Sequence, residues 1–519
     1  MGASTRRAVL IVGVAAMVAA LTAVVFLVRA GGDPADAATW PISWELRSSD
    51  NGPLFQFLQD VMAGRPLDWS FSPQVFVFPE LPISAVAFVV TGGSVYGYYL
   101  VVAMLNNTVL LLVLLALVRV LFPAAAWRES VLRAAIATLP LLVFPLIGTS
   151  WILSFHLAPT YYFGMYAALL AAPVVVLTPS RGARIAMAVA LALTAASNPL
   201  ALLFAAPGTA IALALLVVRH GWRAARRPVV TVGALLLGAL VLRLLFSPLQ
   251  GTSPFTYVDA DVFAGRLAQI VPYFAYQARD PAAGVVLTMG LVLAVVCLAV
   301  AAVAAVLYVR GSAQPDRRLL AVVVLGVMPL GGLGATFVVM ITHYLYFWPV
   351  LILPWVLVLL AVPRVAVSAV AASGALVLVV VAMATGVTTQ LGTVDRYFGY
   401  RNTETACLDA AVPGQLGYAT FSDARRLSLT SRTGMRLIQI ESSGEPSHWL
   451  TNRAYSTMQA GTFFYVNGHG DELQLDALAL SARFGDPDRT VSCADAQTVL
   501  IYSDPTKLAK IAAGYGVAH

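Results

Sequence analysis

Residues 8–28 read AVLIVGVAAMVAALTAVVFLV, and this uninterrupted apolar stretch follows directly after Arg6 and Arg7. At 1.5 Å per residue, a helix of about 21 residues covers the ~30 Å hydrocarbon layer of a membrane. A cleaved secretory signal is the alternative, but its apolar core usually has only ~7–15 residues. The length therefore favours an uncleaved first transmembrane helix, with the N-terminus in the cytoplasm.

The composition extends this interpretation to most of the chain. Of the 519 residues, 59% are hydrophobic and only 11% are charged, whereas soluble domains have about 25% charged residues. Ten further apolar runs of near-helical length follow the first, so we predict a polytopic α-helical membrane protein with about eleven transmembrane helices. The runs are 95–118, 134–151, 161–178, 184–197, 199–218, 229–247, 283–309, 319–341, 344–362 and 365–386.

Arginine placement gives the predicted orientation. Assigning alternate sides to the loops leaves Arg266 and Arg279 in the outer loop 248–282, and no arginine in the outer turns 152–160, 197–199 and 342–343. This asymmetry follows the positive-inside rule, so the net charge of +7 indicates topology and not nucleic-acid binding. The predicted cytoplasmic arginines are Arg6, Arg7, Arg119, Arg128, Arg133, Arg181, Arg184, Arg219, Arg223, Arg226, Arg227, Arg310, Arg317, Arg318 and Arg364.

The composition changes near residue 387, where charged residues, Gly and Ser become common. Residues 1–386 are thus the predicted transmembrane domain, and residues 387–519 a small α/β domain outside the cytoplasm. Helix-like stretches at Ser447–Met458 and Glu472–Phe484 separate short β-type runs. Those runs are Gln415–Ala419, Arg436–Ile440, Phe463–Val466 and Thr498–Tyr502.

The loop at 30–94 is the most informative polar segment, because it holds acidic residues among aromatic ones. Asp50 lies in Asp50-Asn51-Gly52-Pro53, Asp68 precedes Trp69, and Glu80 follows Phe78-Pro79. Between the first two acids, Leu54, Phe55, Phe57, Leu58, Val61 and Met62 have the spacing of an amphipathic helix on the membrane surface. Long loops of this kind are usually structured or functional, although Asp50 also fits a turn and Glu80 a helix N-terminus.

This arrangement resembles the GT-C glycosyltransferases, polytopic enzymes that take sugars from polyprenyl-phosphate carriers. In that superfamily the first outer loop carries a catalytic acid, and Asp50 occupies the matching place. Phe78-Pro79-Glu80 is similar to a bacterial pattern with an acid after Phe-Pro, and His343-Tyr344-Leu345-Tyr346-Phe347-Trp348-Pro349 to a segment with His or Arg before Tyr-Leu-x-Pro. The resemblance implies a sugar transferase on the outer face of the cytoplasmic membrane, with a cell-envelope glycan or lipid as acceptor.

The chemistry of such a transfer assigns roles to several residues. Asp50 could act as general base on the acceptor hydroxyl, and cations must hold the carrier phosphate. Arg243, near the outer end of the run 229–247, is a candidate phosphate ligand or a snorkelling side chain. The further substrate-binding candidates at outer positions are His343, Tyr344, His156 and Glu80.

Other polar groups have weaker assignments. Asn106 and Asn107 lie mid-membrane, where hydrogen bonds between helices are the expected role. No Cys/His spacing indicates a metal site, and a divalent metal, with Glu80 as a possible ligand, is left open as a cofactor. The aromatic and acidic residues that could form a sugar-stacking wall in the loop 248–282 are Tyr257, Asp259, Asp261, Tyr273, Phe274 and Tyr276.

Two alternatives to the enzyme remain open. A flippase for a lipid-linked precursor would need similar helical halves and polar groups at mid-bilayer, and an envelope scaffold would need neither. A P-loop, a Rossmann glycine fingerprint and a nucleophile elbow are absent from the sequence.

The cysteines support the outer placement of the tail. Cys297 lies inside an apolar run, whereas Cys407 and Cys493 bracket most of the polar domain. An oxidising compartment would join them, so we predict a Cys407–Cys493 disulfide.

Overall fold

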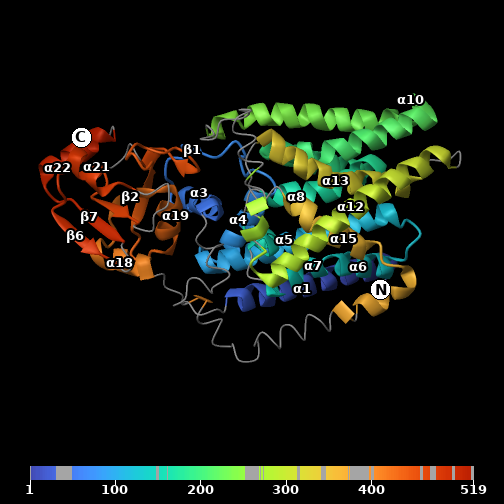
Figure 1. Ribbon diagram of the computed structural model, residues 1–519, viewed down its shortest axis with the longest axis horizontal. Helices are drawn as coiled ribbons and strands as arrows, with labels where there is room; N and C mark the ends of the chain where they lie inside the picture. Colours follow the sequence, from blue (N-terminus) through green and yellow to red (C-terminus); the bar gives the residue numbers. More distant parts are fainter. Residues whose placement is uncertain are drawn as a thin grey trace.

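Figure 1 shows the computed structural model, in which a bundle of long helices adjoins a smaller domain built around a β-sheet. The end of the bundle that faces the sheet domain is called the domain end below, and the opposite end the far end. The structure describes residues 2–30, 49–147, 151–159, 162–251, 268, 271–272, 274–276, 278–311, 316–339, 347–371, 373–374, 397–398, 403–455, 460–467, 475–493 and 497–515.

Five stretches of described helix are long and apolar enough to cross a membrane. They are compatible with a multi-pass membrane protein, as the composition predicts. The stretches are Ser4–Arg29, Val95–Leu121, Trp127–Ile147, Leu200–Leu245 and Pro281–Arg310.

The bundle helices follow the apolar runs closely. Helix α1 runs from the far end toward the sheet domain (Figure 1). The helix bounds are α1 Ala3–Ala30, α5 Val95–Leu121, α6 Trp127–Ala137, α7 Leu139–Ile147, α8 Phe163–Leu177, α9 Arg181–Ser197, α10 Leu200–Leu245, α12 Pro281–Arg310, α13 Arg317–Val339, α14 Trp348–Leu351 and α15 Leu353–Leu360.

Two predicted runs differ in detail from the observed helices, and one pair shares a single label. The run 134–151 is split into α6 and α7 near Pro140, whose ring nitrogen cannot donate a helix hydrogen bond. The runs 199–218 and 229–247 form the two helical parts of α10, which are separated at Gly221, where φ is 73°, a conformation that glycine tolerates. The run 344–362 is interrupted at Ile352, and most of the run 365–386 lies outside the described residues.

Helix α8 forms the centre of the bundle and is buried along its whole length. It is apolar on every side, as expected for a helix with protein all round, and it packs against α5, α9, α10 and α13. Asn107 on α5 donates to the hydroxyl of Thr22 on α1, 3.0 Å away. This is the predicted kind of interhelical hydrogen bond within an apolar surrounding.

Arginines at the far end bind backbone carbonyls. Arg133 on α6 donates to the carbonyls of Leu360, at 3.3 Å, and Val362, at 2.5 Å, where α15 ends. Arg119 donates to the Ala125 carbonyl at 2.6 Å. Helix C-terminal carbonyls carry partial negative charge and lack intrahelical donors, so Arg133 satisfies those at the end of α15, whereas Arg119 binds the loop between α5 and α6.

The sheet domain is a three-layer α/β unit. Its five strands have the order β3-β2-β5-β7-β6, with β3, β2 and β5 parallel and β7 and β6 antiparallel to their neighbours. Helices α18 and α19 pack on one face of the sheet, and α21 and α22 on the other. The bounds are α18 Thr403–Ala411, β2 Leu416–Thr420, α19 Phe421–Thr430, β3 Arg436–Ile440, β5 Phe463–Val466, α21 Ala477–Phe484, β6 Arg489–Ser492, β7 Thr498–Ile501 and α22 Pro505–Gly514.

Outcomes in this domain are mixed. All four predicted strands are present within one residue of their predicted bounds. The predicted helix Ser447–Met458 is wrong over 447–453, which includes the short strand β4, Thr451–Asn452. The predicted Cys407–Cys493 disulfide is present, with Cα atoms 6.0 Å apart. The predicted domain boundary at residue 386 lies outside the described residues.

Candidate functional site

The segment between α1 and α5 builds a platform at the domain end of the bundle. The predicted amphipathic helix is α3, Pro53–Met62, and it follows a short turn, η1, Ser49–Asn51. Phe55 of α3 packs edge-on against the rings of Phe88 and Tyr98. Phe88 belongs to α4, Glu80–Val90, so α3 is seated on α4 and α5 by its aromatic face. The acids at 50, 60, 68 and 80 are all carried by this platform.

Asp50 lies in η1, directly beneath α19 of the sheet domain. Its side chain is only half-buried. Partial removal of the Asp50 carboxyl from water raises its pKa from 3.8 to about 6. The positive charge of Arg425 on α19 opposes that rise. A carboxylate with residual exposure and a pKa near neutrality has the properties of a general base.

Arg425 comes from the sheet domain and is buried. Burial lowers the pKa of its guanidinium to about 10, and the negative charge of Asp50 opposes this change. The group therefore stays cationic at neutral pH. The sequence interpretation did not include Arg425, because nothing local indicates that residue 425 meets residue 50.

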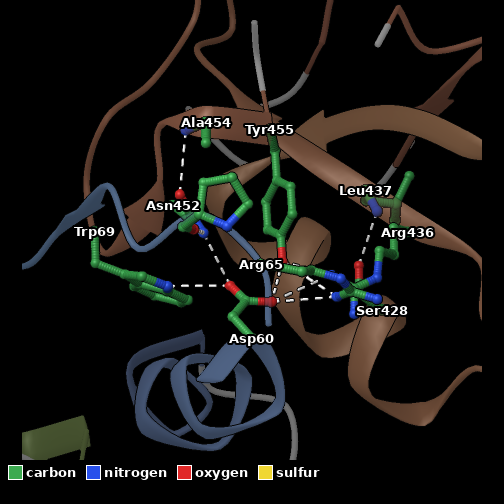
Figure 2. A network of polar contacts seen from close by, with 10 residues as sticks. Asp60, Arg65, Trp69, Ser428, Arg436, Leu437, Asn452, Ala454 and Tyr455 are labelled. Atoms are coloured by element: carbon green, nitrogen blue, oxygen red, sulfur yellow. Dashed lines mark hydrogen bonds and ion pairs between the residues drawn. The ribbon is translucent and has the colours of Figure 1, made fainter. Parts of the chain in front are cut away.

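A second acid of the platform, Asp60, has a different environment (Figure 2). Its carboxylate is fully buried and accepts hydrogen bonds on both oxygens. Oδ2 accepts from Trp69 Nε1 and from Asn452 Nδ2, each at 3.0 Å. Oδ1 accepts from Arg65 Nη1 at 3.2 Å and from the hydroxyl of Tyr455.

The Asp60 network joins the platform to the sheet domain. Arg436 of β3 lies 3.6 Å from Asp60 and donates to the Tyr455 hydroxyl at 2.6 Å. Beside it, β1, Trp69–Ser70, pairs antiparallel with β4. Asp68 continues the junction through an exposed ion pair with Arg453. The sequence interpretation did not include Asp60. It lies on the polar face of the predicted amphipathic helix, and nothing near it in the sequence indicates that a distant domain covers that face.

Glu80 begins α4 and is buried. Its Oε1 accepts from the backbone nitrogen of Gly164 at 2.7 Å, in the first turn of α8. A side chain at Gly164 would overlap Pro79, because an added Cβ would lie 2.3 Å from Pro79 Cδ. Glu80 thus binds the N-terminus of α8, a different helix from α4, whose first residue it is and whose dipole the sequence-based alternative invoked.

His156 belongs to a segment that enters the bundle instead of crossing its surface. The segment contains the turns η2, Trp151–Leu153, and η3, Phe155–Leu157, and its residues 152–158 are buried. His156 Nε2 donates to the Leu141 carbonyl at 2.7 Å, and its Nδ1 has no hydrogen-bond partner within the described part of the chain. Asn106 donates to the carbonyls of His156, at 3.1 Å, and Ala158, at 3.3 Å. Irregular backbone at membrane depth needs such internal partners.

Arg243 lies near the domain end of α10, half-buried. Its Nη1 donates at 3.2 Å to the carbonyl of Ala196, in the last turn of α9. The backbone of the adjacent Ser197 contacts the platform, since Val75 donates to its carbonyl at 2.9 Å. Arg243 therefore lies on the same end of the bundle as the platform.

Several predicted site residues lie outside the described residues, namely His343, Tyr344, Tyr257, Asp259, Asp261 and Tyr273. Of the proposed sugar-stacking wall, Phe274 packs against Phe347 with ring centroids 5.1 Å apart, and Tyr276 is exposed beneath Arg279. Trp348, from the same motif as His343, is stacked on Tyr166 at 4.1 Å.

The described residues contain no group of three or more His, Cys, Asp or Glu side chains placed to hold a metal ion. Asp50 of the platform interacts electrostatically with Arg425 of the sheet domain, and the Asp50 side chain is half-buried. The possible divalent cofactor stays an open prediction.

Comparison with known proteins does not assign the chain to a class. No protein-family model matches the sequence, and no curated protein matches it. Functional inference therefore rests on the site itself.

Proposed function

We propose that the protein is a membrane glycosyltransferase of GT-C type, which transfers a sugar from a polyprenyl-phosphate donor to a cell-envelope glycan or lipid acceptor. The observation that carries the proposal is Asp50, an accessible acid with a pKa of about 6 at the domain end of the bundle. The arginine asymmetry of the sequence supports a location of this end outside the cytoplasmic membrane.

The reaction needs one base and a stabilised leaving group. The acceptor oxygen attacks the anomeric carbon while its proton passes to Asp50. The bond from the anomeric carbon to the phosphate oxygen breaks, and the carrier phosphate departs with the electron pair. Arg243 is the proposed phosphate ligand among described residues, because a guanidinium has five donors and does not titrate at neutral pH.

Asp50→Asn tests the base. Membranes containing the protein are given a panel of undecaprenyl-phosphate sugars with extracted envelope glycan, and release of undecaprenyl phosphate is measured. We expect a loss of ~10²-fold or more with unchanged expression. Asp68→Asn is the matched control, since Asp68 lies in the same platform but is exposed and paired with Arg453. Near-normal release by Asp50→Asn would remove Asp50 from the mechanism.

Orientation has its own test. A periplasmic reporter fused after residue 390 should be active, and one fused near residue 224 should be inactive, because the arginines cluster at the far end. The reverse pair of results would place the sheet domain in the cytoplasm and exclude an outer-face transferase.

One observation favours a flippase as the second candidate. The buried segment at 151–158 and the polar side chain of Asn106 lie within the bundle, and irregular backbone at membrane depth is a feature of transporters. A fluorescent undecaprenyl-phosphate sugar in vesicles, quenched from outside, would report its movement. Movement that Asn106→Leu abolishes and Asp50→Asn leaves intact would favour this function.

A further inference from the structure

The contact between η1 and α19 is unusually close. An added Cβ on Gly52 would lie 2.5 Å from Leu429 Cδ1 and 2.6 Å from Arg425 Cδ. Since Gly52 has φ −92°, its backbone conformation does not require glycine. Because Gly52 has no side chain, the aliphatic part of Arg425 can pass directly over it. Gly52 follows Asp50 and Asn51 in the chain.

Arg425 is also held by its own domain. Its Nη2 donates to the carbonyl of Leu450, and its guanidinium lies 5.4 Å from the centroid of the Phe421 ring. Leu450 is buried and adopts φ 54°, a conformation that is strained for a residue with a side chain. Strained backbone at a contact suggests that the geometry of the contact is under functional constraint.

The charged and titratable groups around Arg425 indicate the effect of its position next to η1. Arg425 interacts electrostatically with Asp50 and with Tyr99, in the first turns of α5. Among the described residues, α5 faces this region with tyrosines, Tyr96, Tyr98 and Tyr99, instead of charged groups. The positive charge of Arg425 therefore lowers the pKa of Asp50, which burial raises.

We propose that the sheet domain completes the candidate catalytic centre, with Arg425 as the positioning residue that keeps the Asp50 carboxylate ionised. The inference rests on the proposed function, in which Asp50 acts as base. It assigns the domain a direct role in the reaction, because the docked domain brings the Arg425 charge to Asp50. Arg425 acts through Asp50 and is not itself placed on the substrate.

Carbodiimide labelling of Asp50, followed by mass spectrometry across a pH series, measures its ionisation without any need for activity. An opposite charge at short range lowers a carboxyl pKa by about 1–3 units. Arg425→Gln should therefore move the labelling midpoint upward by at least about one unit, and Arg425→Lys should largely restore it. Arg453→Gln is the matched control, because Arg453 pairs across the same junction with Asp68.

The pH profile of undecaprenyl phosphate release gives the second measurement. A one-unit rise reduces the ionised fraction roughly fivefold at pH 6 and hardly at all at pH 8, so Arg425→Gln should be defective at pH 6 and recover at pH 8. A purely structural role would lower activity equally at both pH values. Such an equal loss with an unmoved labelling midpoint in folded protein overturns the inference.

If Arg425→Gln does not fold, Gly52→Ala provides a second test. This variant keeps both charges but displaces the side chain of Arg425. Its labelling midpoint should also rise, and an unmoved midpoint contradicts the inference. A shifted midpoint in protein that consumes no donor would instead refute the proposed function and leave the pairing intact.

Discussion

Asp50 and Asp60 lie ten positions apart on one platform, and both meet the sheet domain, yet their environments differ. Asp60 is fully buried, and both of its oxygens accept hydrogen bonds from donors fixed in place (Figure 2). Asp50 is half-buried, and its pKa is raised to about 6 with Arg425 as the opposing charge.

The difference separates attachment from reactivity. The Asp60 carboxylate accepts from four hydrogen-bond donors and has little lone-pair capacity left for a substrate. A carboxylate whose desolvation exceeds its pairing binds a proton near neutral pH and remains able to accept one from a hydroxyl. The Asp60 contacts attach the sheet domain to the platform. In the proposed function, the attached domain brings Arg425 to Asp50.

Loss of the disulfide is the largest perturbation to the comparison. Cys407 and Cys493 enclose a separation of 86 residues, which includes Arg425 and Asn452. The chain-entropy relation gives a stabilisation of roughly 4–5 kcal/mol for such a loop. Replacing both cysteines by alanine should therefore lower the unfolding temperature of the sheet domain and weaken both junctions, measured by hydrogen exchange.

Cys297→Ala is the control, because Cys297 is a free thiol of the bundle. If the double alanine variant exchanges like the wild type at both junctions, the bridge does not stabilise the domain that carries Arg425.

Removal of the Asp60 carboxylate should have the next largest effect. Asp60→Ala leaves the buried donors of Trp69 and Asn452 without their shared acceptor, and a buried donor left unsatisfied costs about 1–3 kcal/mol. We expect faster hydrogen exchange at β1 and β4 and easier proteolysis between the two parts of the chain. Asp68→Asn should change exchange there by far less, as its pair is exposed. Unchanged exchange in Asp60→Ala would show that the apolar contacts alone attach the domain.

Features of the fold were predictable from the sequence where neighbouring residues determine them. The long apolar helices and the four β-type runs were predictable, because helix and strand periodicity is set by neighbouring residues. Strand β6, Arg489–Ser492, was missed because it is an exposed edge strand with a polar sequence. Helix α19 was missed as well, since its many polar residues are buried only by tertiary contacts.

The candidate site divides in the same way. Asp50 became a candidate base through the resemblance of its loop to the first outer loop of GT-C enzymes, and that role stays a prediction. Its partner Arg425 is 375 positions away, and no pattern around either residue encodes the contact. Gly52 showed only turn chemistry in the sequence, whereas the structure gives its lack of a side chain a second reason, the close approach of Arg425.

The smallest effect sharpens the comparison most, because the two acids should respond with opposite sign. The folded pKa of Asp50, about 6, exceeds the ordinary aspartate value of 3.8, so the folded state holds its proton more tightly than the unfolded state. Asp50 then destabilises the fold increasingly as pH rises from about 4 to about 6. Asp50→Asn should consequently be more stable than the wild type by on the order of 1–3 kcal/mol at pH 8, and equal to it below about pH 4. Asp60→Asn should be less stable at pH 8, since it loses a fully hydrogen-bonded anion. Chemical denaturation of the sheet domain at pH 4 and pH 8 measures both variants, and destabilisation by Asp50→Asn at pH 8 would mean that its pairing with Arg425 outweighs its burial.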